Sequence, residues 1–174
     1  IECTADDFNR SAFVQLNLVG GKVEQLFIVG FAHPDELLHL VDEDTNAFNK
    51  IMEALGMPKG NDEEKAARAA ALQEATLYAT QVPLRTMEVS YEVFDLVEAM
   101  AQEGNPNSVS DAGVGALAAR SAVLGAFLNV KINAADLKDR AAADALISKA
   151  AEIAAKAQKR EKEILAVVDA KIEA

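Results

Sequence analysis

The stretch from Gly104 to Asn133 constrains the fold more than any other part of this chain. It opens with the turn signal Gly-Asn-Pro-Asn, and Ser108 follows as a candidate helix N-cap with Asp111 three residues later. Between Val109 and Ile132 the strongly polar residues are Ser110, Asp111, Arg120, Ser121, Asn129 and Lys131. A helix that is apolar almost all round belongs in an interior, so the stretch predicts a central buried helix in an all-α, multihelical bundle.

The polar ends of this central helix lie far apart. Asp111 and Asn129 are separated by five helical turns, which puts them on one face but about 27 Å apart. One straight helix cannot join them in a single site. Two copies packed antiparallel across a two-fold axis would bring Asp111 of one chain near Asn129 and Asn133 of the other, so we predict a homodimer or a higher homo-oligomer. The simpler interpretation is a central helix with polar ends.

Three glycines lie inside the predicted central helix, where glycine is unfavourable. Gly113, Gly115 and Gly125 each cost about 1 kcal/mol relative to alanine in a helix interior. That cost indicates close approach of another backbone or of a ligand.

Composition narrows the class of protein. The chain has 174 residues, 51% of them hydrophobic but only 5% aromatic, which suits closely packed, alanine-rich helices. A net charge of -11 argues against nucleic acid or an anionic membrane as the main partner. Cys3 is the only cysteine, so neither a disulfide framework nor a cysteine metal site is expected. Arg120 interrupts the most apolar run, and we therefore expect no transmembrane span and a cytoplasmic protein.

The chain divides near residue 33. Residues 1–33 contain two apolar runs around Gly20-Gly21, a pattern that predicts a β-hairpin appendage without an assigned function. The sequence pattern of residues 34–174 predicts helices throughout. The first runs from Pro34 to a stop at Gly56 to Gly60, and the next begins near Asn61 and is kinked at Pro83 or divided into two abutting helices. A long helix is predicted from Ala141 to Ile172.

Two polar side chains stand out on these helices. Asp44 lies within the apolar stripe formed by Leu37, Val41, Phe48, Ile51 and Leu55, so we expect its carboxylate to be turned inward. Such a group is paired, hydrogen-bonded or shifted in pKa, and either a catalytic or ligand role or a structural cap or ion pair fits it. Arg85 follows the proline, and an ion-paired arginine is favoured there over a ligand contact.

The usual catalytic motifs are missing from the sequence. There is no nucleophile elbow, zinc-protease motif or glycine-rich phosphate loop, and His33 and His39 do not share a helical face, so no metal site is expected. A set of carboxylate, carboxamide and hydroxyl side chains remains. Its members are Asp44, Asn105, Ser110, Asp111, Asn129 and Asn133. Such a set suits proton transfer and hydrogen bonding to a flat, amide-rich ligand without a metal.

Four segments together resemble a known family. They are LVDEDTNAFNKIMEALGMPKG at 40–60, Val82-Pro83, GNPNSVSDAGVG at 104–115 and NVKIN at 129–133. With their spacing, they resemble the cyclodeaminase domain of formiminotransferase-cyclodeaminase and its stand-alone bacterial relatives, which include methenyltetrahydrofolate cyclohydrolases. The resemblance covers residues 35–174, whereas residues 1–33 do not resemble the family.

The resemblance implies an all-helical enzyme with its active site at a dimer interface. The implied reaction converts 5-formiminotetrahydrofolate to 5,10-methenyltetrahydrofolate and ammonia, in histidine degradation and one-carbon metabolism. The folate is a substrate, no prosthetic group is implied, and a formiminotransferase domain is an expected partner. Asp111 or Asp44 would be the catalytic acid-base.

The remaining polar residues of the set would bind the substrate. Asn105, Asn129 and Asn133 would hold pterin or formimino nitrogens, and Ser110 would support Asp111, for which helix capping is the alternative role. Two other functions stay open. One is a cyclohydrolase on the same scaffold. The other is a non-catalytic helical dimerisation module, because the Pro-Gly-Gly-Gly-Ser-type loop that precedes the matching segments in the family has no counterpart here.

Overall fold

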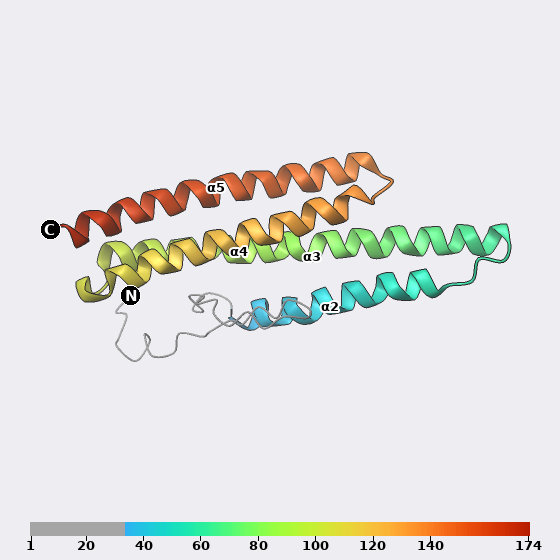
Figure 1. Ribbon diagram of the computed structural model, residues 1–174, viewed down its shortest axis with the longest axis horizontal. Helices are drawn as coiled ribbons and strands as arrows, with labels where there is room; N and C mark the ends of the chain where they lie inside the picture. The colour runs from blue at the N-terminus through green and yellow to red at the C-terminus, as the bar shows by residue number, and fades with distance from the viewer. Residues whose placement is uncertain (1–33) are drawn as a thin grey trace.

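The computed structural model describes residues 34–174, which form four long helices and one short 3-10 turn. In chain order these are α2 (Pro34–Gly56), α3 (Asp62–Glu103), η1 (Pro106–Ser108), α4 (Val109–Ala135) and α5 (Arg140–Ile172). They lie side by side in an elongated bundle in which successive helices run antiparallel (Figure 1). The predicted helical region is confirmed. The predicted hairpin lies outside the described residues.

Three helix boundaries follow directly from local residues. The Asn61 side chain accepts a hydrogen bond from the Glu64 N–H at 2.8 Å and begins α3, and the Asp139 side chain accepts one from the Ala142 N–H at 3.0 Å and begins α5. Helix α3 ends at Gly104, where a Cβ would lie 2.4 Å from the Met100 carbonyl oxygen, so only glycine fits. Ser108 occupies the N-cap position of α4, but its side chain makes no capping hydrogen bond. The predicted capping pair of Ser108 and Asp111 is therefore wrong, although the helix does start there.

Helix α4 packs between α3 and α5 and carries the main core. Its small buried residues, among them Ala116 and Ala119, face large side chains such as Phe94 on α3 and Ile164 on α5. A Cβ on Gly113 would lie 3.3 Å from a methyl group of Val168, so this glycine allows close approach of α5. No described atom lies within 4 Å of a Cβ built on Gly125, so Gly125 faces open space.

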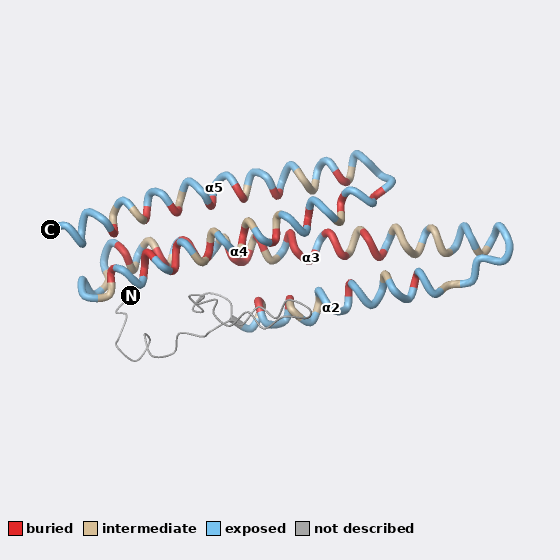
Figure 2. The backbone as a smooth tube through the Cα atoms, viewed as in Figure 1, coloured by how far each residue is buried: buried red, intermediate tan, exposed pale blue. Residues whose placement is uncertain are grey.

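One face of α4 is not covered, which corrects the expectation of a fully buried central helix. Val114, Leu117, Leu128 and Ile132 are 46–67% exposed, and we call these four residues the α4 apolar stripe. Buried residues line only the sides of α4 that face its neighbours (Figure 2). Residues Pro106–Ala135 are long and apolar enough to cross a membrane by length and composition alone, a test that the core helix of a soluble bundle also passes.

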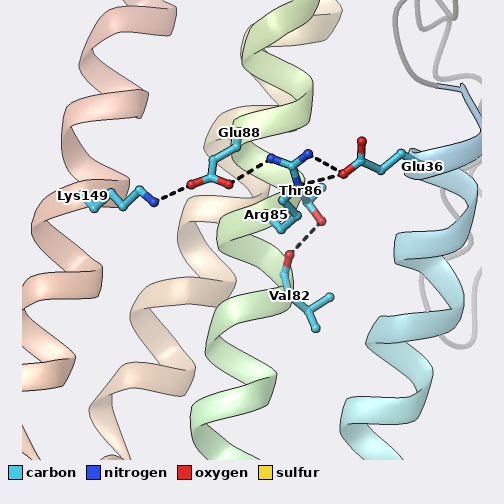
Figure 3. Close-up of polar contacts among 6 residues, drawn as sticks. All are labelled: Glu36, Val82, Arg85, Thr86, Glu88 and Lys149. Atoms are coloured by element: carbon cyan, nitrogen blue, oxygen red, sulfur yellow. Dashed lines mark hydrogen bonds and ion pairs between the residues drawn. The ribbon is translucent and has the colours of Figure 1, made fainter.

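Helix α2 makes its extensive contacts with α3 and is held to it by polar as well as apolar groups. Glu36 on α2 accepts a hydrogen bond from Arg85 Nε at 2.7 Å, and Arg85 also contacts Glu88 at 3.3 Å. Lys149 on α5 contacts the other oxygen of Glu88 at 2.6 Å. This chain of charges joins three helices (Figure 3), and it shows Arg85 to be ion-paired, as expected.

Candidate functional site

The cross-helix hydrogen bonds fix which predicted site residues lie at the same level along α3. Glu43 on α2 accepts a hydrogen bond from the Tyr78 hydroxyl, which places Asp44 level with residues 77–78. Asn133 on α4 donates to the Ala79 carbonyl oxygen at 2.6 Å. Asp44 and Asn133 therefore lie at one level, on the two helices that flank α3.

These two side chains also face the same side of the bundle. Glu36 and Glu43 contact Arg85 and Tyr78 on the side of α3 that faces away from α4. Asp44 is rotated by 100° from Glu43 about the axis of α2, which places it on the border nearer α4. Asn133 lies on the border of α4 that contacts α3. We use the name α2–α4 trough for the region between Asp44 on α2 and Asn133 on α4, beside the buried Ala79 of α3.

The structure corrects the expected orientation of Asp44. Asp44 is exposed, because the face of α2 that packs on α3 carries Leu40, Ala47 and Ala54 together with only Leu37 and Ile51 of the predicted stripe. Phe48 and Leu55 from that stripe are 62% and 43% exposed. The acids that α2 turns toward α3 are Glu36 and Glu43, and the pKa of Glu43 is lowered chiefly by the hydrogen bond from Tyr78. Partial loss of water nevertheless raises the pKa of Asp44.

Asn133 is the one member of the predicted set that is partly buried. Its Nδ2 is committed to Ala79, which leaves the carboxamide oxygen Oδ1 without a described partner. Asn129 lies one turn earlier and donates to the Gly125 carbonyl oxygen at 3.3 Å, within its own helix. Asn129 is exposed and lies on the same border of α4, so it extends the trough.

The other predicted residues lie at the opposite end of α4. Asp111 and Ser110 are exposed in its first turn, and Asp111 forms no hydrogen bond or ion pair with residues 34–174. Asn105 is exposed in the preceding turn, where its side chain accepts a hydrogen bond from the Asn107 N–H at 3.0 Å. Within one chain these three residues lie more than five helical turns from Asn133, so the described chain does not bring the predicted set together.

Several functional-looking contacts were not predicted from sequence. Lys50 lies 3.9 Å from the ring centre of Tyr78, on the opposite side of α2 from the trough. A groove of about 610 Å³ lies there, lined by Lys50, Glu53, Glu74, Tyr78 and Gln81 among others, and it contains none of the predicted site residues. Arg120 contacts the buried Glu161 at 3.2 Å between α4 and α5. The one sequence signal for this ion pair is the presence of Arg120 in the middle of an otherwise apolar helix.

The described fold and the trough define an all-helical domain whose candidate site offers carboxylates and carboxamides. Among residues 34–174 no three His, Cys, Asp or Glu side chains are grouped to hold a metal ion. The chain belongs to the formiminotransferase-cyclodeaminase family, whose model matches residues 21–152. The match begins inside the N-terminal segment and ends within α5.

Individual relatives agree with this assignment. A methenyltetrahydrofolate cyclohydrolase from Methylorubrum extorquens is 43% identical over 136 residues, which are 78% of this chain and 65% of that protein. A formimidoyltransferase-cyclodeaminase from Mus musculus is 39% identical over 104 residues, 60% of this chain and 19% of that protein. This chain thus spans less than two thirds of either relative.

A solved structure supports the fold. The crystal structure of formiminotetrahydrofolate cyclodeaminase from Thermotoga maritima superposes with a TM-score of 0.66. The superposition covers 77% of this chain and 63% of that one, at 22% sequence identity. At this identity the likeness shows the all-helical fold alone.

Proposed function

We propose that this chain is a methenyltetrahydrofolate cyclohydrolase, which adds water to 5,10-methenyltetrahydrofolate to give 10-formyltetrahydrofolate and a proton. The observation that supports it best is the 43% identity to a protein with that name, together with a raised carboxylate pKa in the α2–α4 trough. The cyclodeaminase reaction, which forms the same methenyl compound from 5-formiminotetrahydrofolate in histidine breakdown, is the second candidate. The family match and the Mus musculus relative favour it.

Asp44 is suited to the proton transfer that the hydration needs. Water attacks the methenyl carbon, a base removes a proton from it, and the C–N5 bond of the resulting tetrahedral adduct breaks with proton delivery to N5. A carboxylate whose pKa is raised by partial loss of water accepts and returns a proton more readily than an ordinary aspartate does. The methenyl bridge carries a positive charge, which a carboxylate also stabilises electrostatically.

We further propose that the site is completed by a second copy of the chain. The α4 apolar stripe is symmetric along the helix: Val114 and Ile132 lie equally far from its middle, and so do Leu117 and Leu128. Two antiparallel α4 helices crossing there would pair Val114 with Ile132 and Leu117 with Leu128 of the other copy. Near the crossing lie Ser121 and Gly125, and the open space at Gly125 suits close approach.

The same crossing brings the separated polar residues together. A two-fold axis at the middle of the stripe puts Asp111 of the second copy level with Asn133 of the first, next to the trough. Ser110 and Asn105 of the second copy would line its rim and bind substrate with Asn129 and Asn133. The proposed protein is thus a cytoplasmic homodimer with two folate sites and no prosthetic group.

Offering both substrates to the purified chain tests the proposal. A cyclohydrolase consumes the methenyl compound, with loss of its near-ultraviolet absorbance, and releases no ammonia from the formimino compound. Ammonia release as the main activity would favour the cyclodeaminase instead. A folded dimer that binds and turns over neither folate would overturn both enzymatic proposals and leave a dimerisation module.

A further inference from the structure

Pro83 lies inside α3 and leaves one buried carbonyl group without its helical partner. In an α-helix the carbonyl oxygen of residue 79 accepts the N–H of residue 83, and proline has no N–H. Both Ala79 and Pro83 are buried, so water cannot replace the missing donor. A buried carbonyl without a partner costs about 1–3 kcal/mol.

Asn133 supplies the missing donor from the neighbouring helix. Its Nδ2 lies 2.6 Å from the Ala79 carbonyl oxygen, the oxygen that Pro83 leaves free. The hydrogen bond thus connects two of the segments that resemble the family, Val82-Pro83 on α3 and NVKIN on α4. The Ala79 carbonyl oxygen has no helical donor because of Pro83, and the Asn133 carboxamide is the donor that the described residues supply to it.

We propose that Pro83 is a positioning residue, which orients the Asn133 carboxamide for the ligand through the carbonyl group of Ala79. With Nδ2 committed to Ala79, the orientation of the carboxamide is fixed, and Oδ1 remains to accept a hydrogen bond from an N–H group in the α2–α4 trough. The ligand edge that fits it is a ring amide or amino group, which a pterin provides. This inference rests on the proposed function, since it assigns a role in folate binding.

A double-mutant cycle between Pro83→Ala and Asn133→Ala tests the pairing. Pro83→Ala restores an N–H to the helix and so satisfies Ala79 without Asn133. We expect Asn133→Ala to lower Tm clearly in the natural chain and much less in the Pro83→Ala background. Gln73→Ala is the control, because Gln73 also bonds across to a backbone carbonyl, that of Asp136 at 3.1 Å, and its effect on Tm should be equal in both backgrounds.

Steady-state kinetics test the role in binding. Pro83→Ala should raise KM for the folate substrate about five- to tenfold while the chain stays folded and kcat changes less, the equivalent of one hydrogen bond. A merely structural proline would leave KM unchanged. Gln73→Ala should leave KM at the natural value.

Two results would overturn the inference. Equal Tm losses from Asn133→Ala in both backgrounds would refute the pairing, and an unchanged KM in Pro83→Ala would refute the positioning role. A natural chain that neither binds nor turns over folate would refute the proposed function and, with it, the positioning role. The thermal cycle would still decide the pairing, so the two failures are distinguishable.

Discussion

At the scale of single residues, the chemistry of the candidate site depends on the pKa of the Asp44 carboxylate. The surrounding protein shifts that pKa even though the side chain is exposed. The carboxylate lies at the surface, yet the surrounding protein removes enough water to raise its pKa. Asp42, two residues earlier, lies on the outer face of the same helix and is also exposed, which makes it a matched control. Comparing variants of Asp44 and Asp42 therefore distinguishes an effect specific to the trough from a general effect of negative charge on α2.

Replacing Asp44 with asparagine should remove turnover and leave the fold intact. Loss of a general acid-base typically slows a reaction about 10²–10⁴-fold. If the natural chain has the proposed activity, its kcat/KM should rise with pH through the raised pKa of Asp44, since the base must be ionised. Asp42→Asn should keep both the rate and the pH profile, and equal losses in the two variants would argue against a special role for Asp44.

The same pKa shift predicts the direction of a stability effect. Because the folded state raises the pKa of Asp44, it favours the protonated form, and the ionised form destabilises the fold at neutral pH. Asp44→Asn should therefore raise Tm slightly at pH 7. The gain should disappear as the pH falls below the ordinary aspartate pKa of 3.8, where the natural side chain is protonated in both states. A gain that persists at low pH would contradict the shift.

Arg120 and Glu161 give a second prediction at this scale. Arg120→Met leaves the buried Glu161 carboxylate unpaired, and we expect the free energy of unfolding to fall by about 3 kcal/mol in urea titrations. The double variant with Glu161→Met should recover most of that loss. Breaking the exposed pair of Lys156 and Glu152 by Lys156→Met should change little by comparison. No recovery in the double variant would show that packing, not charge, causes the loss.

At the scale of elements, the attachment of α2 decides whether the trough keeps its shape. Helix α2 bonds to α3 through Glu36, Glu43 and, near its C-terminus, the Leu55 carbonyl, which accepts from Arg68 at 3.0 Å. Arg85 is the residue that links this attachment to α5 through Glu88 and Lys149 (Figure 3). These contacts of α2, rather than contacts of the Asp44 side chain itself, fix the position of Asp44.

Arg85→Met should loosen the N-terminal half of α2. We expect faster amide hydrogen exchange in residues 36–44, with exchange in α4 and α5 unchanged, and a smaller difference at high salt because the pairs are partly exposed. Lys65→Met removes a pair with Asp62 that lies within α3 and should leave exchange in α2 unchanged. Uniform acceleration in all helices would mean that Arg85 stabilises the bundle as a whole.

Sequence patterns predicted the elements better than the faces. Pro34, Asn61, Gly104 and Gly56 mark helix ends through local chemistry, so those boundaries could be predicted. The orientation of α2 could not, because Phe48 and Leu55 look like core residues until the neighbouring helix is known. The sequence indicates Asn133 as a candidate site residue. Its hydrogen-bond partner is the Ala79 carbonyl group, which lacks a helical donor because of Pro83, and no local sequence pattern shows a contact between residues 54 positions apart.

At the scale of the whole molecule, the described chain leaves two apolar surfaces uncovered. The α4 apolar stripe is one, and the other consists of Leu38, Phe48, Met52 and Leu55 on α2, on the side of the trough. Exposed patches of this kind mark interaction surfaces. A second copy packed over the α4 apolar stripe would cover apolar area and close the trough at the same time.

Charge placed in that stripe should separate the copies. Leu128→Glu should shift the chain from dimer to monomer in sedimentation equilibrium and lower turnover, because the monomer lacks Asp111 at its trough. Ile172→Glu is the matched control, since Ile172 is 61% exposed at the end of α5, away from the stripe. A monomeric and fully active Leu128→Glu variant would rule out a shared site.

Mixing two inactive variants tests the central claim most directly. Asp44→Asn and Asp111→Asn should each be folded, dimeric and inactive alone. If each site takes Asp44 from one copy and Asp111 from the other, random exchange in an equal mixture gives heterodimers with one intact site, and turnover should return to about a quarter of the natural value. No recovery after demonstrated subunit exchange would contradict a site shared between two copies.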